Sequence, residues 1–307
     1  MGLIGLMSQA TKIMRLSCYI WILILPLILC SCQKRNAGLV VVCGWDEVFI
    51  SDISIDVPEK IWSWTAEDSD GLPASMRNKF LTTDECKPVS KGREILITSS
   101  GGGIALINRK DKKVSFYASL PNAHSAEILP GNRVAVAGSY SQEGNCINLY
   151  DAGKPNIVLF SDSLYGAHGL LWDRNERSLW ALGDYELRKY RLGHRKNNGT
   201  SLKLDRSYDL PGDGGHDLAF HEESKDIALS TQNNVWIFDT KSELFTKHPL
   251  LGEEINVKSI SFNKATGETA YVKSTDDNWW AYYIRFAGSE RVVYLPYEKI
   301  YKVRWLY

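Results

Sequence analysis

Short runs of apolar residues alternate with turn residues from Leu39 onward, and no long helical pattern interrupts them. Runs of this length, bounded by Gly, Asn, Asp and Ser, predict β-strands joined by tight turns. A chain of many short strands folds as a sandwich, a barrel or a propeller. The pattern therefore predicts an all-β domain over residues 39–307.

An internal repeat favours the propeller among these folds. Residues 168–180, 216–228 and 258–270 share one order of strand, polar turn and strand. Repetition at a fixed period is typical of propellers. A two-sheet sandwich, which needs no regular period, stays the alternative.

The repeat places six first strands at intervals of 40, 44, 48, 42 and 43 residues, the length of a four-stranded blade. Residues 301–307 have room for one strand, and residues 39–43 have no inner strand before them. We therefore predict a six-bladed β-propeller of four-stranded antiparallel blades, whose first blade is closed by N- and C-terminal strands. Such closure removes an open sheet edge. The expected first residues of the six strands are Asp84, His124, His168, His216, Lys258 and Tyr301.

The N-terminal residues predict export. Lys12 and Arg15 precede an apolar run over residues 19–29. This order is typical of a signal peptide, and the run is short for a membrane-spanning helix. Residues 29–32, Leu-Cys-Ser-Cys, are similar to a bacterial lipobox, which implies cleavage before Cys32 and lipidation of its thiol. The alternative is an uncleaved signal anchor.

These features predict three parts: a lipoprotein signal peptide over residues 1–32, a short tether over 33–38 and the propeller over 39–307. We expect an exported protein, lipid-anchored to the bacterial membrane on its periplasmic side or at the cell surface. Its membrane contact is expected through the lipid anchor only. Three cysteines follow the predicted cleavage site without zinc-ligand spacing, so we expect buried small apolar side chains at Cys43, Cys86 and Cys146.

The charge balance excludes one class of partner. The 36 Lys and Arg residues equal the 36 Asp and Glu residues in number, and no segment concentrates the cations. Proteins that bind nucleic acid depend on a positive field. We therefore expect no nucleic-acid partner.

The six strand starts predict the candidate site. Because the chain reverses direction at each strand, the start of every first strand and the second-to-third loop of every blade meet on one face, at the mouth of the central channel. A small residue precedes each of the three histidines, which leaves space beside each ring. His and Lys suit proton transfer and anion binding near neutral pH. The predicted ligand-binding residues are Asp84, His124, His168, His216, Trp45 and Trp279.

A glycan is the predicted ligand. Loops on this face mix amides, carboxylates and aromatic rings, as in residues 44–46, 139–144 and 276–280. Aromatic faces suit the C–H faces of sugars, and planar polar groups suit their hydroxyls. The alternative is that these residues only form turns and pack between blades.

Three histidines on successive repeats also suggest a divalent metal held by His124, His168 and His216. The alternative is that each imidazole binds backbone carbonyl groups and no ion. The remaining histidines, His194 and His248 among them, lie outside the repeat position and receive no role.

The lipobox and the repeated strand-start histidine segments resemble an uncharacterised family of secreted β-propeller lipoproteins from Bacteroidota, over the whole mature chain. That resemblance implies no activity. As a site, the histidine-lined channel is similar to that of oligogalacturonate lyases, which are seven-bladed and place several His and a Gln around manganese. This chain differs in its six predicted blades and in having no clear Gln counterpart.

Three functions therefore stay open: a glycan-binding lipoprotein, a metal-assisted polysaccharide (uronate) lyase, and a non-catalytic protein-interaction scaffold. In the lyase, a metal on the three histidines would neutralise a uronate carboxylate. Lys258 or Tyr301 would then take the α-proton, since a nearby cation lowers the pKa of a lysine. The sequence leaves open whether the protein is an enzyme.

The lipobox generates the first testable prediction. Radiolabelled fatty acid should enter the wild-type protein and not the Cys32→Ala variant, because only the thiol of Cys32 accepts the lipid. Equal labelling of both proteins would overturn the lipid anchor.

Overall fold

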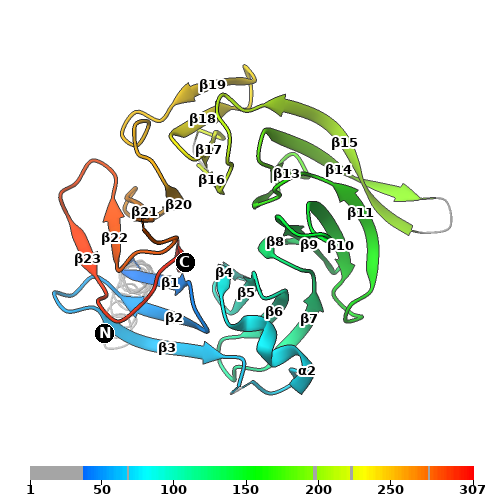
Figure 1. The fold of residues 1–307 in the computed structure, drawn as a ribbon, viewed down its shortest axis with the longest axis horizontal. Coiled ribbons are helices and arrows are strands. Elements are labelled where there is room, and N and C mark those ends of the chain that lie inside the picture. The colour runs from blue at the N-terminus through cyan, green and yellow to red at the C-terminus, as the bar shows by residue number, and fades with distance from the viewer. Residues whose placement is uncertain (1–36, 68, 196–198, 222–223, 276) are drawn as a thin grey trace, which may run out of the picture.

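The computed structural model describes residues 37–67, 69–195, 199–221, 224–275 and 277–307, and its strands form six four-stranded antiparallel sheets. Figure 1 shows these sheets as blades around a common centre. The chain is therefore a six-bladed β-propeller, as the repeat predicts. The predicted signal peptide and most of the predicted tether lie outside the described residues.

Five blades are each built from four consecutive strands, and all six predicted strand starts lie within one residue of an observed inner strand. In Figure 1, inner strands such as β4 and β16 lie near the centre, and β7 and β19 lie at the rim. From inner to outer strand, blades B to F are β4 (Thr83–Val89), β5 (Glu94–Ser99), β6 (Gly103–Asn108) and β7 (Val114–Ser119); β8 (Ala123–Leu129), β9 (Arg133–Gly138), β10 (Cys146–Asp151) and β11 (Val158–Ser163); β12 (Gly169–Asp173), β13 (Ser178–Leu182), β14 (Glu186–Arg195) and β15 (Gly199–Asp209); β16 (Asp217–Phe220), β17 (Ile227–Ser230), β18 (Val235–Asp239) and β19 (Leu244–Lys247); and β20 (Val257–Phe262), β21 (Thr269–Lys273), β22 (Tyr283–Phe286) and β23 (Val292–Tyr294).

Blade A joins the two ends of the propeller. Its inner strand is β24, which pairs antiparallel with β1 and sets Val40 opposite Trp305 and Val42 opposite Val303. This confirms the predicted closure. The strands of blade A are β24 (Lys302–Trp305), β1 (Leu39–Cys43), β2 (Glu47–Asp52) and β3 (Glu59–Thr65).

Apolar side chains fill the interfaces between neighbouring blades. Among the described residues, six buried clusters each combine two adjacent blades. The long connection between blades A and B contributes to one of them, because α2 (Ala74–Arg77) and η1 (Asn78–Phe80) bury Met76 and Phe80 there. The ring of Phe80 packs edge-on against Trp64, with 5.4 Å between ring centroids.

The cysteines behave as predicted. Cys43, Cys86 and Cys146 are buried and not paired in disulfides. Cys43 and Cys86 belong to the cluster between blades A and B. Burial raises the pKa of the Cys43 thiol well above its usual value, so this side chain acts as a small apolar group.

Both ends of the propeller lie on one face. The carbonyl of Ala37 accepts a hydrogen bond from Nδ2 of Asn263 (2.8 Å), which directly follows the end of β20. The last inner strand, β24, also ends on this face, which we call the base face. The strand starts lie on the opposite, mouth face. Within residues 37–307, no helix is long and apolar enough to cross a membrane. A chain beginning at Gln33 retains every described residue.

Charged side chains of three inner strands meet across the ring axis. Arg304 donates hydrogen bonds of 2.8 and 2.9 Å to Glu85, and two of 2.7 Å to Asp217. Lys302 places Nζ 3.1 Å from Oδ1 of Asp217 and 3.7 Å from Oε2 of Glu85. All four side chains are buried. This central ion cluster connects blade A to blades B and E.

Ionisation of the cluster follows from its pairing. Burial alone would raise the pKa of Glu85 and Asp217, but the charges of Arg304 and Lys302 hold both pKa values below their usual range. Two carboxylates therefore balance two cations at neutral pH. A buried ion pair destabilises a protein strongly when one partner is removed, because the remaining charge stays buried and unpaired.

The central ion cluster predicts a large effect on stability. The Arg304→Met variant should lose about 3–5 kcal/mol of unfolding free energy, because two buried carboxylates would keep only Lys302. Urea unfolding followed by tryptophan fluorescence measures the loss. In the matched control Arg191→Met, which removes an exposed ion pair with Asp205, the change should stay below about 1 kcal/mol. Equal losses in the two variants would contradict the proposed role of Arg304.

Candidate functional site

A β-bulge positions each predicted mouth residue. In three inner strands, the register skips one residue, so that two residues oppose one on the neighbouring strand. In the other three, the N–H of the mouth residue bonds to the partner of the residue that follows it. Bulges re-aim side chains and often lie beside functional sites. The skipped residues are Asp84, His124 and Lys258, and the three bonded ones are His168, His216 and Tyr301.

These six residues form one connected group, which we call the mouth cluster. The rings of His124 and His168 contact each other edge to face, with centroids 4.4 Å apart, and those of His168 and His216 are 5.2 Å apart. Nζ of Lys258 lies 2.9 Å from Nε2 of His216. Oδ1 of Asp84 lies 3.6 Å from Nε2 of His124. The structure therefore brings the predicted residues together, and their roles stay predictions.

Backbone carbonyl groups orient two of the histidines. Nδ1 of His124 donates to the carbonyl of Asn122 (3.0 Å), and Nδ1 of His168 donates to that of Gly166 (2.8 Å). Because a carbonyl only accepts, each Nδ1 carries the hydrogen, and Nε2 is the acceptor of the neutral ring. Burial and the charges of neighbouring histidines lower the pKa of His168 well below its usual value.

Lys258 and His216 form a pair that favours the neutral imidazole. The lysine donates to Nε2 of His216. Burial, then the charge of Lys258, lowers the pKa of His216 to about 3. Burial, then the charge of Lys302, lowers the pKa of Lys258 to about 8. Lys258 is thus the mouth-cluster cation that loses its proton closest to neutral pH.

A glutamine also reaches the mouth cluster, which corrects the expectation that no Gln has such a place. Oε1 of Gln232, in the loop between β17 and β18, lies 3.2 Å from Nε2 of His216. Nδ1 of His216 is buried and has no hydrogen-bond partner in the described part of the chain. The loop was visible in the sequence, but its contact with His216 depends on the ring geometry.

The small residues before the histidines have a different reason from the one expected. Ala123 and Ala167 are fully buried in the clusters between blades. A Cβ at Gly215 would lie 2.3 Å from the carbonyl oxygen of Gly183. These residues are therefore small because neighbouring backbone approaches closely, and not to leave space beside the imidazoles.

Two buried oxygen acids complete the mouth cluster. Asp84 accepts a hydrogen bond from the backbone N–H of Ser100, and burial raises its pKa against the opposing effect of His124. Burial, then the nearby Asp84, raises the pKa of Tyr301 well above its usual value. The Tyr301 phenol therefore stays protonated, so that Lys258 is the better base of the two predicted ones.

Tryptophans form an aromatic group beside Tyr301. Trp45 stacks on Trp279 with centroids 5.5 Å apart and planes 14° apart, and both are more than one third exposed. The ring of Trp279 lies 5.6 Å from that of Tyr301. Nζ of Lys299 lies 4.0 Å from the centroid of Trp45. The predicted binding residues Trp45 and Trp279 thus lie next to the mouth cluster.

Tyrosines form a second aromatic group beside His168. The ring of Tyr140 lies 5.6 Å from that of His168, and its hydroxyl donates to Asp184. Tyr165 and Tyr185 stack with planes 1° apart, and all three tyrosines are exposed. The sequence analysis did not single out Tyr165. Its signal was its position three residues before His168, in a connection that leads to the mouth face.

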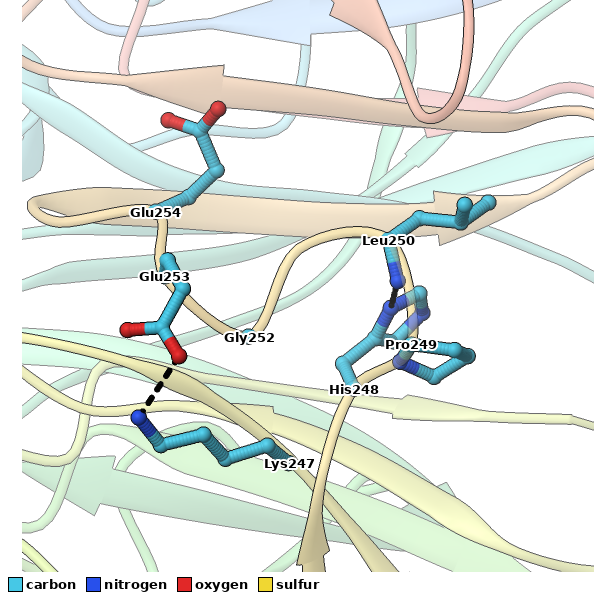
Figure 2. A pocket seen from close by; sticks show the side chains of 7 residues that line it. All are labelled: Lys247, His248, Pro249, Leu250, Gly252, Glu253 and Glu254. Carbon is cyan, nitrogen blue, oxygen red and sulfur yellow. Dashed lines mark hydrogen bonds and ion pairs between the residues drawn. The ribbon is translucent and has the colours of Figure 1, made fainter.

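The other histidines have separate environments. Figure 2 shows a surface pocket of about 400 Å³ that contains His248 and the ion pair of Lys247 with Glu253. Nδ1 of His248 accepts hydrogen bonds from the backbone N–H groups of Leu250 and Leu251, both 3.1 Å long. His248 therefore stabilises a turn. The side chain of His194 lies outside the described side chains.

The predicted metal needs three free imidazole nitrogens. Nε2 of His216 already accepts from Lys258, whose ammonium group would repel a cation beside it. Within the described residues, no three His, Cys, Asp or Glu side chains are arranged to hold a metal ion. As positioned, the cluster does not fit a divalent ion. The metal on His124 and His168 stays a prediction, and no later step depends on it.

The fold and the mouth cluster define a six-bladed β-propeller with a polar, aromatic-flanked mouth. The chain belongs to the family of unknown function DUF6528, whose model matches residues 41–307. No curated protein matches the chain. A crystal structure of the mitotic checkpoint complex is similar over 63% of this chain, with 10% sequence identity and a TM-score of 0.48. The match spans 58% of that other chain.

The mouth cluster predicts one unusual lysine. In NMR spectra of lysine-labelled protein, the resonance that disappears in the Lys258→Arg variant should titrate near pH 8, because burial disfavours the charged form. Since the unfolded lysine keeps its proton to about pH 10.4, the folded state gains stability as the pH rises from about 8 to 10. An ordinary pKa for this resonance would contradict the geometry.

Proposed function

We propose that the mouth face binds a glycan. The observation that carries this proposal is the pair of exposed aromatic groups on two sides of one polar cluster. Trp45 and Trp279 lie on blades A and F, and the three tyrosines lie on blades C and D. Sugar rings stack their C–H faces on such surfaces, while hydroxyls bond to polar groups between them.

The charges of the mouth cluster favour an acidic sugar. The Lys258 ammonium is a partly buried cation that a uronate carboxylate can approach. His124 and Gln232 supply further polar groups next to it. The adjacent Asp84 opposes an anion when ionised, but its raised pKa reduces that opposition.

We further propose that the protein is an exported bacterial lipoprotein, of the kind found in Bacteroidota, anchored through Cys32. The described chain begins at Ala37 on the base face. An anchor on that side would turn the mouth face away from the membrane. This orientation suits the capture of a soluble or cell-surface polysaccharide.

Calorimetric titration with neutral and uronate oligosaccharides tests the glycan proposal. The Trp279→Ala variant should bind about tenfold more weakly or worse, because it loses a stacking face. Uronate affinity of the wild type should also fall above about pH 8, where Lys258 loses its proton. The control Tyr294→Ala removes a 58% exposed ring from β23 of the same blade and should bind normally.

Two outcomes would overturn glycan binding. One is that no oligosaccharide binds, which would leave a protein-interaction scaffold. The other is that the Trp279 and Tyr294 variants lose affinity equally.

A uronate lyase is the second candidate, favoured by the lowered pKa of Lys258. The neutral amine would take the α-proton, the C4–O bond would break, and the departing oxygen would gain a proton. Buried Tyr301 keeps its proton and is the closest candidate donor by its place in the cluster. Unsaturated sugar product during the titration would identify the enzyme, and its absence in Lys258→Met would assign the base.

A further inference from the structure

A second cavity lies on the base face, at the end of the channel remote from the mouth cluster. It has a volume of about 860 Å³ and is lined by the ends of inner strands from all six blades and the turns after them. Its floor includes Arg304 of the central ion cluster, together with Lys87 and Glu127. The floor therefore separates this basal cavity from the mouth.

The floor is electrically balanced and fixed. Nζ of Lys87 lies 2.8 Å from Oε1 of Glu127 and 2.6 Å from the carbonyl of Leu170. Arg304 is fully engaged by Glu85 and Asp217. A ligand in the basal cavity would thus rest on a rigid surface whose donors are already used.

The rim of the cavity is positive. Exposed cations surround it, and Glu127 is the one carboxylate among the described lining residues. None of Lys91, Arg93, Arg174 and Lys225 lies within ion-pair distance of a carboxylate in the described part of the chain. Unneutralised cations around a concave surface concentrate anions there.

The walls supply an apolar surface beside these cations. Trp172, Phe220 and Phe262 line the cavity, and Nζ of Lys225 lies 5.8 Å from the ring centroid of Phe220. Small-molecule sites commonly combine aromatic walls with a few charged groups. The walls can hold the carbon part of a ligand whose anionic group faces the rim.

We propose that the basal cavity binds a phosphate-bearing ligand, either the headgroup of an anionic lipid or a soluble phosphate ester. A phosphate group carries up to two charges and three acceptor oxygens, which suits several cations better than a single carboxylate does. Arg93 and Arg174 can each bind it through two parallel hydrogen bonds. This site is independent of glycan binding at the mouth face.

The course of the chain adds a reason to consider lipid headgroups. Ala37 lies on the same face as the cavity. Five residues separate it from Cys32, and they span at most about 18 Å when fully extended. If Cys32 carries lipid, the basal cavity lies close to the membrane surface. The Debye length at physiological salt is about 8 Å, so headgroup attraction would act at this range.

The test uses the chain from Gln33 onward, which has no lipid anchor of its own. One arm titrates glycerol 3-phosphate by calorimetry. The other measures co-sedimentation with vesicles of phosphatidylcholine, alone or mixed with phosphatidylglycerol. The cavity variant is Arg93→Gln/Arg174→Gln. Its control, Lys203→Gln/Arg206→Gln, removes the same charge from exposed positions on β15.

The proposal expects the cavity variant to lose affinity about tenfold or more in at least one arm, while the control binds like the wild type. Binding to mixed vesicles that glycerol 3-phosphate inhibits identifies a lipid headgroup. Binding to glycerol 3-phosphate without vesicle binding identifies a soluble ester. The proposal is overturned if neither probe binds, or if the two variants weaken binding equally, since that would reflect general charge attraction.

Discussion

The double ion pair of Arg304 is the interaction on which the ring depends. One guanidinium from β24 binds Glu85 of blade B and Asp217 of blade E, and Lys302 lies against the same carboxylates. The clusters between blades hold neighbours together, but each involves only two blades. The central ion cluster adds contacts across the axis. It also closes the channel between the mouth face and the base face, so the two ends can have different chemistry.

The bulges connect this cluster to the mouth. At each inner strand, the bulge residue joins the mouth cluster, and the next residue faces the axis below it, as Asp84 and Glu85 or His216 and Asp217 do. A regular strand would send successive side chains to opposite faces. The repeated bulge therefore lets one short strand supply both layers. Lys302 then couples them, because its charge helps to lower the pKa of Lys258.

The sequence predicted the fold through its period and the site through its repeated strand starts. It predicted closure because residues 301–307 supply one strand and residues 39–43 lack an inner neighbour. It missed the central ion cluster, although Glu85, Asp217 and Arg304 are charged residues within apolar inner strands. Such residues indicate a polar axis, but which of them pair depends on how far apart six blades set their inner strands.

The same limit explains what was missed at the mouth face. Tyr165 and Gln232 lie in connections whose sequence is typical of turns, and only the ring brings them to His168 and His216. Their lengths and turn residues did not distinguish them from other polar loops.

Closure by β24 has a consequence for the timing of folding. During synthesis, β1 to β23 can form before β24 exists, but blade A then lacks its inner strand, and Glu85 and Asp217 lack their main cation. The nascent chain therefore keeps an open ring with unneutralised carboxylates at its centre until the residues around Arg304 have been made. A chain destined to cross a membrane unfolded gains from such a delay. The strand that stabilises the finished propeller also keeps the unfinished one competent for transport.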